Sequence, residues 1–493
     1  MKTSFFAVAA ALAASTASAQ DLPQANSDWF TAGQAHIEAM LARQPNTGKA
    51  KNVILLVSDG NGVGTNYATR VFAGQQEGKL GEEHVLPYET TDWNSAIVKT
   101  YNINAQTPDS APTAGAMNSG IKQRFNLINL NENGIHEDCS SVTGNEVTVF
   151  SELQTEAGKS VGIISTARLT HATPAAVYAK TANRNWEDSV PEDCTAQKDI
   201  ASQLIDAMEA GTIDFAMGGG GRHFLPADFE MGNLKGRRKD GENLIEKATG
   251  LGAQFASDTE SFNALDLAAD SPILALYENS HMQYNADRTD EPSLAEMTKS
   301  AIEYLSKNEN GFYLEIEAGR VDHASHAGNA YRTLTDGLAF IDAVKMADEL
   351  TNDEDTLIIV TADHEHAIAF NGYCGRGSDI TGLCMGVAKE GDSHSGEPLL
   401  AKDGKPYTVI GFLNGTGSVL REDVNWVGAR PDLTQEDATD MDYIQQALIP
   451  TSSETHSGED VAVYAKGPWA HLFDGTIEQN VIFHVMNHAV NVE

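Results

Sequence analysis

The chain has 493 residues, 41% of them hydrophobic, so it is long enough for one large domain with insertions or for two domains, and it can build a sizeable core. It carries 70 acidic against 33 basic residues, and this net charge of −37 is spread along the sequence, which argues against nucleic-acid binding because contacts to a phosphate backbone need basic clusters. Repulsion among so many acidic side chains suggests a salt-rich habitat, because salt weakens it. No apolar run after the N-terminus is long enough to cross a membrane.

Residues 1–19 have the features of a signal peptide. Lys2 supplies the positive start, residues 5–14 form an apolar stretch, and Ala17-Ser18-Ala19 is a small-residue cleavage site. A buried N-terminal helix is the alternative, but periodic structure begins only near Asp28. We therefore expect an exported protein, periplasmic or secreted. The C-terminal residues lack the apolar tail of a lipid-anchor signal, so we expect no membrane anchor.

Apolar periodicity predicts a helix over residues 28–44, followed by short apolar runs that alternate with helical patterns. The runs predict buried strands at 53–57, 161–164, 214–217, 312–316, 357–360 and 461–464. The helical patterns lie at 146–157, 199–208, 294–305 and 334–350. This alternation indicates an α/β fold with a doubly wound, mostly parallel central sheet and helices on both faces. Residues 20–493 are thus predicted to form one domain, with insertions near 219–280 and 371–450.

The four cysteines, Cys139, Cys194, Cys374 and Cys384, all follow the predicted signal peptide. An even number of cysteines in an exported chain suggests two disulfides. Cys374 and Cys384 are close enough in sequence to staple one loop, which leaves Cys139 and Cys194 to pair by elimination. Four free thiols would contradict the export signal, and a cysteine metal site is disfavoured because the sequence has no C-x-x-C pair.

Polar side chains follow four of the predicted strands at the points where those strands end. In open α/β sheets, ligands bind outside the carboxyl ends of the strands. Any one of these residues alone would be a helix cap or a turn residue, but four strands that deliver such residues to one edge indicate a metal site. The residues are Asp59, His171, Thr173, Glu317, Asp363 and His364.

A second set of candidate ligands comes from outside these strand ends. Asp322 and His326 have the i, i+4 spacing that places both on one helix face, where they can hold one ion or form a surface ion pair. His456 precedes the predicted strand at 461–464. Neutral imidazoles mixed with carboxylates suit zinc, whereas carboxylates with a hydroxyl suit magnesium. Two zinc ions about 4 Å apart can clamp the attacking and the leaving oxygen of a phosphoryl group.

Ser110 is the candidate nucleophile. It follows Asp109, and small residues continue to Gly115, which is consistent with a helix N-terminus whose free N–H groups attract a phosphate. A serine beside an aspartate is also a common helix cap, so this segment alone is weak evidence for a nucleophile. The candidate metal ligands described above support the assignment. Arg184 lies a short distance after Thr173 and can make a bidentate contact to phosphate oxygens.

These residues resemble the alkaline phosphatase family over residues 52–486, and the detail is nearer to its animal-like branch than to the enteric bacterial enzymes. With its acidic composition, we expect a bacterial member from a halophile. Pro112 and Gly115 depart from the small residues usual after the nucleophile. The motifs that carry the resemblance are Val57-Ser58-Asp59-Gly60, Asp109-Ser110-Ala111, His171-Ala172-Thr173-Pro174-Ala175, Asn183-Arg184-Asn185-Trp186, Glu317-Ala318-Gly319-Arg320-Val321-Asp322-His323, Thr361-Ala362-Asp363-His364, Glu454-Thr455-His456 and Ala470-His471-Leu472-Phe473.

The resemblance implies two zinc ions and one magnesium ion. The first zinc would be held by Asp322, His326 and His456. The second zinc would be held by Asp59, Asp363 and His364. The magnesium ion would share Asp59 with the second zinc and be completed by Thr173 and Glu317.

The resemblance also implies that Ser110 forms a phosphoserine intermediate and that Arg184 binds two phosphate oxygens. His171 and His323 stand where some members carry Asp and Lys, which tune the magnesium site and the phosphate contacts. Family enzymes act on a broad range of phosphate monoesters and are dimers, so we expect a homodimer. The insertion near 371–450 resembles the crown region at the family's dimer interface.

Three other functions fit part of the pattern. The segment from Ser110 to Thr113 partly resembles the nucleophile signature of sulfatases, but that signature needs an Arg where this chain has Ala114. Phosphodiesterases of the same superfamily share the zinc ligands but typically lack the magnesium residues and the phosphate-binding Arg. A non-catalytic phosphate-binding protein needs no nucleophile, so Ser110 argues against it. Release of phosphate from a chromogenic monoester separates all of these.

Overall fold

The computed structural model describes residues 22–492, so the signal peptide predicted at 1–19 lies outside the described residues. The chain divides into two compact units, Met1–Gln44 and Pro45–Glu493. The described part of the first unit contains helix α1 (Asp28–Ala42), which apolar periodicity predicts over 28–44. None of its residues is buried, and Trp29 exposes 80% of its surface, so α1 is a solvated helix within its own unit.

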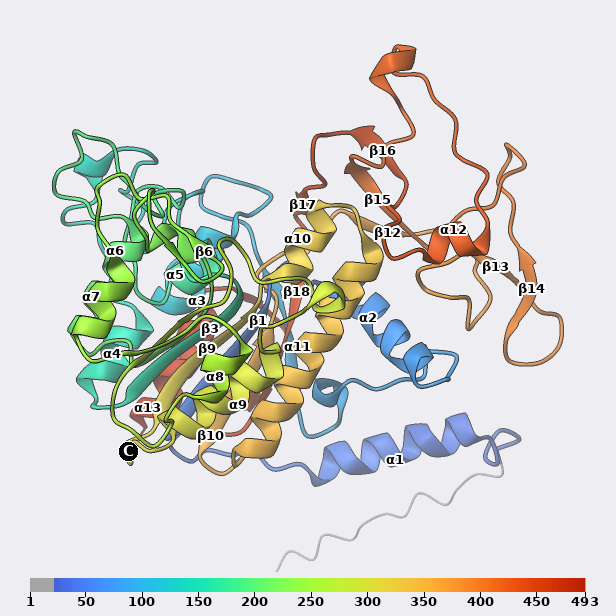
Figure 1. Ribbon diagram of the computed structural model, residues 1–493. Coiled ribbons are helices and arrows are strands. Elements are labelled where there is room, and N and C mark those ends of the chain that lie inside the picture. Colours follow the sequence, from blue (N-terminus) through green and yellow to red (C-terminus); the bar gives the residue numbers. More distant parts are fainter. Residues whose placement is uncertain (1–21, 493) are drawn as a thin grey trace, which may run out of the picture. The chain divides into compact units, whose positions relative to one another are not determined.

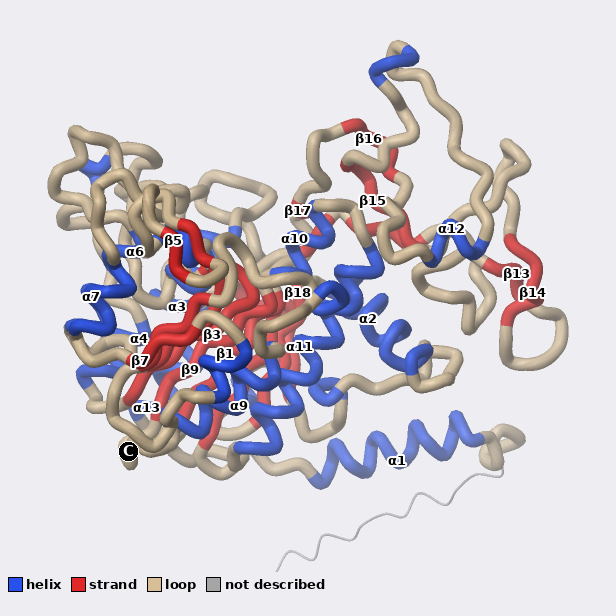
Figure 2. The backbone as a smooth tube through the Cα atoms, viewed as in Figure 1, coloured by secondary structure: helices blue, strands red, loops and turns tan. Residues whose placement is uncertain are grey.

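The second unit is built on a ten-stranded sheet that is mostly parallel (Figure 1 and Figure 2). The strands from β10 to β7 in the order below run parallel, and β18 runs antiparallel to both of its neighbours. This confirms the predicted α/β sheet. The order is β19 (Thr476–Glu478), β2 (Asn94–Lys99), β18 (Val461–Lys466), β10 (Thr356–Thr361), β1 (Asn52–Ser58), β9 (Phe312–Ala318), β3 (Ser160–Arg168), β4 (Phe215–Gly219), β8 (Ile273–Leu276) and β7 (Gln254–Ala256).

Helices cover both faces of the sheet because its central strands are apolar on both sides (Figure 1). In β1, Val53, Leu55 and Val57 point into one core, whereas Ile54 and Leu56 point into the other. The first core is closed by α3 (Ser110–Ser119), α4 (Phe150–Glu156), α5 (Ala172–Ala175), α6 (Ile200–Glu209), α7 (Leu244–Gly250) and α13 (Val481–Asn491). The second is closed by α9 (Leu294–Leu305), α10 (Arg320–His326) and α11 (Ala330–Leu350).

Residues 219–280 contain more of the central sheet than the sequence pattern predicts. After the hairpin of β5 (Glu230–Met231) and β6 (Leu234–Lys235), β7 and β8 extend the parallel ladder beyond β4, with α8 (Thr259–Asn263) between them. Within this predicted insertion, β7 and β8 therefore belong to the central sheet. β7 has only three residues and no apolar run, whereas the four apolar residues of β8 form a run as long as the one at 357–360 and could have been predicted.

Residues 371–450 contain only short elements. A cluster that includes Ile380, Val409 and Ile410 packs against Val71 of α2 (Val63–Gln76). The Cys374–Cys384 disulfide closes a loop here, and the Cys139–Cys194 disulfide lies elsewhere in the unit, so both predicted pairs are present. The short elements in and beside this stretch are β12 (Ile368–Phe370), β13 (Met385–Val387), β14 (His394–Pro398), β15 (Ile410–Gly415), α12 (Gln435–Thr439) and β16 (Ala447–Pro450).

Among the described residues, no helix is both long and apolar enough to span the membrane.

Candidate active site

Ser110 is the first residue of α3, and it is buried. Asp109 caps the helix by accepting a hydrogen bond from the Ala111 amide at 3.3 Å. The Ser110 hydroxyl oxygen lies 3.1 Å from Nε2 of His364. Thr113, one turn later, donates its hydroxyl to Asp363 at 3.2 Å. The helix thus presents a serine hydroxyl and its free N-terminal amides to the strand-end residues.

Asp322, His326 and His456 converge on one point. Oδ1 of Asp322 lies 3.3 Å from Nε2 of His326 and 3.2 Å from Nε2 of His456, and the two Nε2 atoms are 3.1 Å apart. The other ring nitrogen of each histidine faces a backbone carbonyl, that of Glu454 at 2.6 Å for His326 and that of Pro108 at 2.9 Å for His456. Each Nδ1 therefore carries the proton, and both Nε2 atoms offer lone pairs to the centre.

Asp59, Asp363 and His364 form a second group at the ends of β1 and β10. Nε2 of His364 lies 3.4 Å from Asp59 and 3.3 Å from Asp363, and all three residues are fully buried. Asp363 is held by the backbone amides of Gly60 at 3.0 Å and His364 at 2.9 Å. Gly60 has a φ of +68°, and a Cβ there would meet the His366 ring at 2.5 Å, so only glycine fits this turn.

The third group joins Asp59 to Glu317 at the end of β9, with Thr173 in α5 and His171 directly before it. Asp59, His171 and Glu317 offer ligand atoms within 4.8 Å of one another. Both carboxylate oxygens of Asp59, Oγ1 of Thr173 and Oε1 of Glu317 are buried without a hydrogen-bond partner. Ser165 of β3 donates to the other oxygen of Glu317 and so orients it.

Arg184 lies between the nucleophile and the third group. It forms an ion pair with Asp109, and its Nη2 lies 2.9 Å from Nε2 of His171. The ring centroids of His171 and His323 are 5.3 Å apart. Both residues predicted to tune the magnesium site and the phosphate contacts therefore lie near Arg184 and the third group. His281, which the sequence pattern does not single out, packs against His323 with the two ring centroids 3.8 Å apart and the ring planes tilted by 48°.

Two further residues near the first group, His366 and Glu454, were not assigned to the site from the sequence. His366 lies 2.7 Å from Asp322 through Nε2 and 2.5 Å from the Glu454 carboxylate through Nδ1. The two come together because β11 (Glu365–His366) pairs with β17 (His456–Ser457). Spacing gives one signal for His366: in an extended segment it shares a face with His364, two residues earlier.

Burial and charge set the ionisation of these groups. Burial, reinforced by the Asp363 carboxylate, raises the pKa of Asp59 well above its usual value, and burial raises that of Glu317 to about 7. Burial lowers the pKa of His364 well below its usual value, with a further contribution from His456. Burial opposes the charge on Arg184, but the attraction of the Asp109 carboxylate outweighs this effect, so the pKa of Arg184 is raised. The neutral imidazole of His364 thus lies near Asp59, and a cation would return the carboxyl groups of Asp59 and Glu317 to their charged form.

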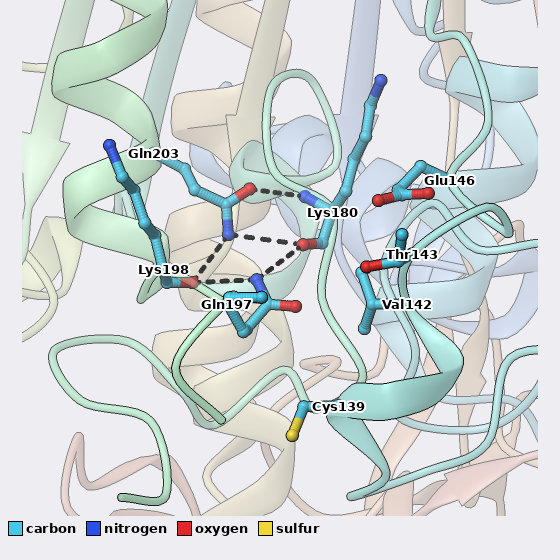
Figure 3. A pocket seen from close by; sticks show the side chains of 9 residues that line it. Cys139, Val142, Thr143, Glu146, Lys180, Gln197, Lys198 and Gln203 are labelled. Atoms are coloured by element: carbon cyan, nitrogen blue, oxygen red, sulfur yellow. Dashed lines mark hydrogen bonds between the residues drawn. The ribbon is translucent and has the colours of Figure 1, made fainter. Parts of the chain in front are cut away.

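Figure 3 shows a pocket of about 290 Å³ beside Cys139, away from these groups. The side-chain amides of Gln197 and Gln203 both donate to the backbone carbonyls of Lys180 and Lys198 along its wall. None of its lining residues belongs to the three groups. The candidate active site therefore rests on the strand ends and on α3.

Comparisons with known proteins agree on one family. The alkaline phosphatase family model matches residues 50–492. The alkaline phosphatase of Gadus morhua is 39% identical over 484 residues, covering 95% of this chain and 97% of that protein. The tissue-nonspecific isozyme of Rattus norvegicus is 38% identical over 468 residues, covering 92% of this chain and 86% of that protein.

Solved structures of bacterial alkaline phosphatases share the fold. The enzyme of Thermus thermophilus has a TM-score of 0.64 at 23% identity, covering 92% of this chain and 94% of that chain. The enzyme of the Antarctic bacterium TAB5 has a TM-score of 0.60 at 23% identity, covering 90% and 98%. The resemblance inferred from the sequence motifs is therefore confirmed. The chain belongs to the alkaline phosphatase family and is a phosphoric monoester hydrolase.

Proposed function

We propose that the enzyme hydrolyses a broad range of phosphate monoesters through a phosphoserine intermediate on Ser110, at a site for two zinc ions and one magnesium ion. The observation that carries the proposal is the placement of the Ser110 hydroxyl at the N-terminus of α3, 3.1 Å from Nε2 of His364. A hydroxyl in this place faces a candidate metal ligand and the anion-binding end of a helix at the same time.

The first group fits a zinc ion. Two Nε2 lone pairs and one carboxylate oxygen lie within about 3.3 Å of one another, and they cannot satisfy each other because both Nδ1 atoms hold the protons. A cation satisfies all three, and zinc prefers this mixture of nitrogen and oxygen donors. We assign the first zinc to Asp322, His326 and His456, and the second to Asp59, Asp363 and His364.

The third group fits magnesium. Four of its five unpartnered buried atoms are oxygens, two from Asp59 and one each from Thr173 and Glu317, and magnesium prefers oxygen ligands; the fifth is Nδ1 of His171. A histidine-to-glutamate mutant of the TAB5 alkaline phosphatase, a neighbour in fold, has been solved with Mg bound in its M3 site. We assign magnesium to Asp59, Thr173 and Glu317, with His171 and His323 as residues that tune the site.

The zinc ions would supply Lewis-acid stabilisation of the charge on the attacking and leaving oxygens. Ser110 Oγ forms a bond to phosphorus as the ester P–O bond breaks and the alcohol leaves. Water then attacks phosphorus, the bond to Oγ breaks, and inorganic phosphate is released with the serine restored. The α3 amides and the Arg184 guanidinium bind the non-bridging oxygens, and Asp109 holds that guanidinium in place.

A Ser110→Ala variant tests the chemistry. It should keep its metal content, lose the first-turnover burst and retain only a small residual rate on a chromogenic monoester. Phosphoserine trapped by acid quench should map to the peptide that contains Ser110. Diester and sulfate-ester substrates serve as controls for the related activities. A variant with full activity and an intact burst would show that the nucleophile is another group.

Removal of metal tests the proposed cofactors. Chelation should abolish activity, and zinc plus magnesium should restore it better than either ion alone. Mass spectrometry of the native protein should report the zinc and magnesium content. Full restoration by zinc alone would contradict the magnesium assignment.

We further propose that residues 20–493 form an exported, salt-adapted homodimer with a crown-like insertion at 371–450. Two disulfides fit an oxidising compartment, the periplasm or the exterior. Apolar side chains in the insertion are exposed, with Leu413 at 53% and Leu448 at 61%, as expected of a surface that a second copy covers. Light scattering after size exclusion should give twice the mass of one chain. The double variant Leu413→Lys, Leu448→Lys should give the mass of a single chain.

A further inference from the structure

Strand β9 carries a carboxylic acid at its buried centre. Glu315 is 1% exposed, and every residue of β9 around it is buried. Its Oε2 accepts a hydrogen bond from the side-chain amide of Asn118 at 2.8 Å. The Tyr313 hydroxyl lies 3.0 Å from the same oxygen and 3.0 Å from Oδ1 of Asn118. These three side chains form a closed polar cluster between the sheet and α3.

Between the contacts of Ser110 and Thr113 at the start of α3 and this cluster, the buried interface of the helix is mostly apolar. Residues 110–118 of α3 are all buried, and most are small, with Ala111, Ala114 and Ala116 among them. Small apolar side chains fill space but leave a helix free to shift along a sheet, because many positions bury the same area. Hydrogen bonds have preferred distances and directions, so the bonds that Oε2 of Glu315 makes in this buried cluster select one position, although its Oε1 has no partner.

Other polar contacts hold the far end of the same helix. The Gly120 carbonyl accepts from Asn480 at 2.9 Å and faces Nε2 of His484 at 3.1 Å. Gly115 lets a neighbouring side chain approach, because a Cβ there would lie 2.5 Å from the Gln123 amide. The glycine at position 115, which departs from the family pattern, is therefore explained by the close packing of Gln123 against α3. These contacts fix the C-terminal end, whereas the Asn118 cluster ties the body of α3 to β9.

We infer that Glu315, Asn118 and Tyr313 anchor α3 to β9 and thereby set the position of the Ser110 hydroxyl. The inference rests on the proposed role of Ser110 as nucleophile. Asn118 lies eight residues after Ser110 in one rigid helix, about 12 Å along its axis, so a shift at the anchor moves the hydroxyl by a similar amount. A displacement of about 1 Å can reduce a reaction rate by about 100-fold. Glu315 and Asn118 are therefore positioning residues.

Three variants separate positioning from stability. Tyr313→Phe, Asn118→Leu and Glu315→Met combined replace the cluster by apolar groups of similar shape, which is nearly neutral when all partners are removed together. Glu315→Gln keeps a hydrogen-bonding side chain of the same shape that cannot ionise. Asn118→Leu alone serves if the triple variant does not fold. Each is compared with the wild type and with Ser110→Ala for thermal unfolding, metal content, kcat, KM and the rate of the first-turnover burst.

We expect the triple variant to fold and to bind metal, but its burst rate and kcat should fall at least tenfold while KM changes less. Glu315→Gln should stay within about threefold of the wild type, and Asn118→Leu should lie well below Glu315→Gln. A folded, metal-loaded triple variant with wild-type kcat, or a Glu315→Gln variant as slow as the triple, would overturn the anchor. Full activity in Ser110→Ala would instead overturn the proposed nucleophile, so the two failures are distinguishable.

Discussion

Nε2 of His171 lies 2.9 Å from Nη2 of Arg184. The same side chain offers a ligand atom within 4.8 Å of those of Asp59 and Glu317. Burial, with the positive charge of Arg184 as the next contribution, lowers the pKa of His171 well below its usual value. A neutral imidazole therefore faces both the proposed phosphate-binding arginine and the proposed magnesium ligands.

Replacement of His171 by aspartate should tighten magnesium binding, because magnesium prefers oxygen to nitrogen. The new carboxylate also faces Arg184 and competes with phosphate for it, so the Ki for inorganic phosphate should rise. A magnesium titration of activity, with phosphate inhibition measured in parallel, checks both effects. An unchanged magnesium dependence would contradict the placement of His171 beside that ion.

Replacement of His366 by alanine should weaken zinc binding at the Asp322 group by about 10- to 100-fold, because a hydrogen-bonded partner that orients a metal-binding carboxylate typically contributes that much. His366 connects Asp322 to the buried Glu454 carboxylate. Competition with a zinc chelator measures the change. His394→Ala, in β14 and outside the three groups, is the control, and equal zinc affinities in both variants would contradict the role.

Much of the fold was predictable because the central strands and their covering helices have strong periodic patterns. The helix at 294–305 was predicted with the bounds of α9. Two other predicted helices, α4 and α11, begin at different residues in the structure. α4 begins at Phe150 and not at 146, because Glu146 and Val147 pair with the chain at Leu130 and Asn129. α11 begins at Ala330 and not at 334, because Asn329 caps it there.

The candidate site was predictable where ligands follow strands, since parallel strands bring their carboxyl ends to one edge. Asp59, Glu317 and Asp363 illustrate this rule. His366 and Glu454 do not follow from it, because their contact depends on the pairing of His366 with His456 between two-residue strands. His281 also arises from tertiary packing, beside His323, which no local spacing reveals.

Replacement of Glu187 by glutamine should destabilise the protein at neutral pH by about 1–3 kcal/mol. Burial opposes the charge on Glu187, but His223 and Arg168 more than offset it and hold its pKa below the usual value. A lowered folded-state pKa stabilises above the unfolded value, about 4.3, and this contribution is lost as the pH falls through the folded pKa. Urea unfolding from pH 7 to 3 should therefore show the two stabilities converging at low pH.

The control for Glu187→Gln is Glu192→Gln, because Glu192 is exposed and belongs to the same loop region. Its stability should match that of the wild type at every pH. A difference between Glu187→Gln and the wild type that grows as the pH falls would reverse the expected sign and contradict the assigned ion pairs.

Salt should stabilise the folded chain. With 70 acidic against 33 basic residues, folding crowds like charges, and the Debye length falls from about 10 Å at 0.1 M to about 3 Å at 1 M salt. The unfolding midpoint should rise over this range in sodium chloride, and activity should persist. Differential scanning calorimetry with parallel assays measures both, and a flat or falling midpoint would contradict the proposed salt adaptation.

The Cys139–Cys194 disulfide spans 55 residues of sequence, and this covalent loop contains His171, Thr173 and Arg184. Closure of a loop of that length lowers the chain entropy of the unfolded state by the equivalent of about 4 kcal/mol. Ser110 and the proposed zinc ligands lie outside the loop. The redox state of the surroundings therefore acts on one part of the site: oxidation favours order in the segment that carries Thr173 and Arg184, whereas Asp59 and Glu317, the other proposed magnesium ligands, lie outside the loop.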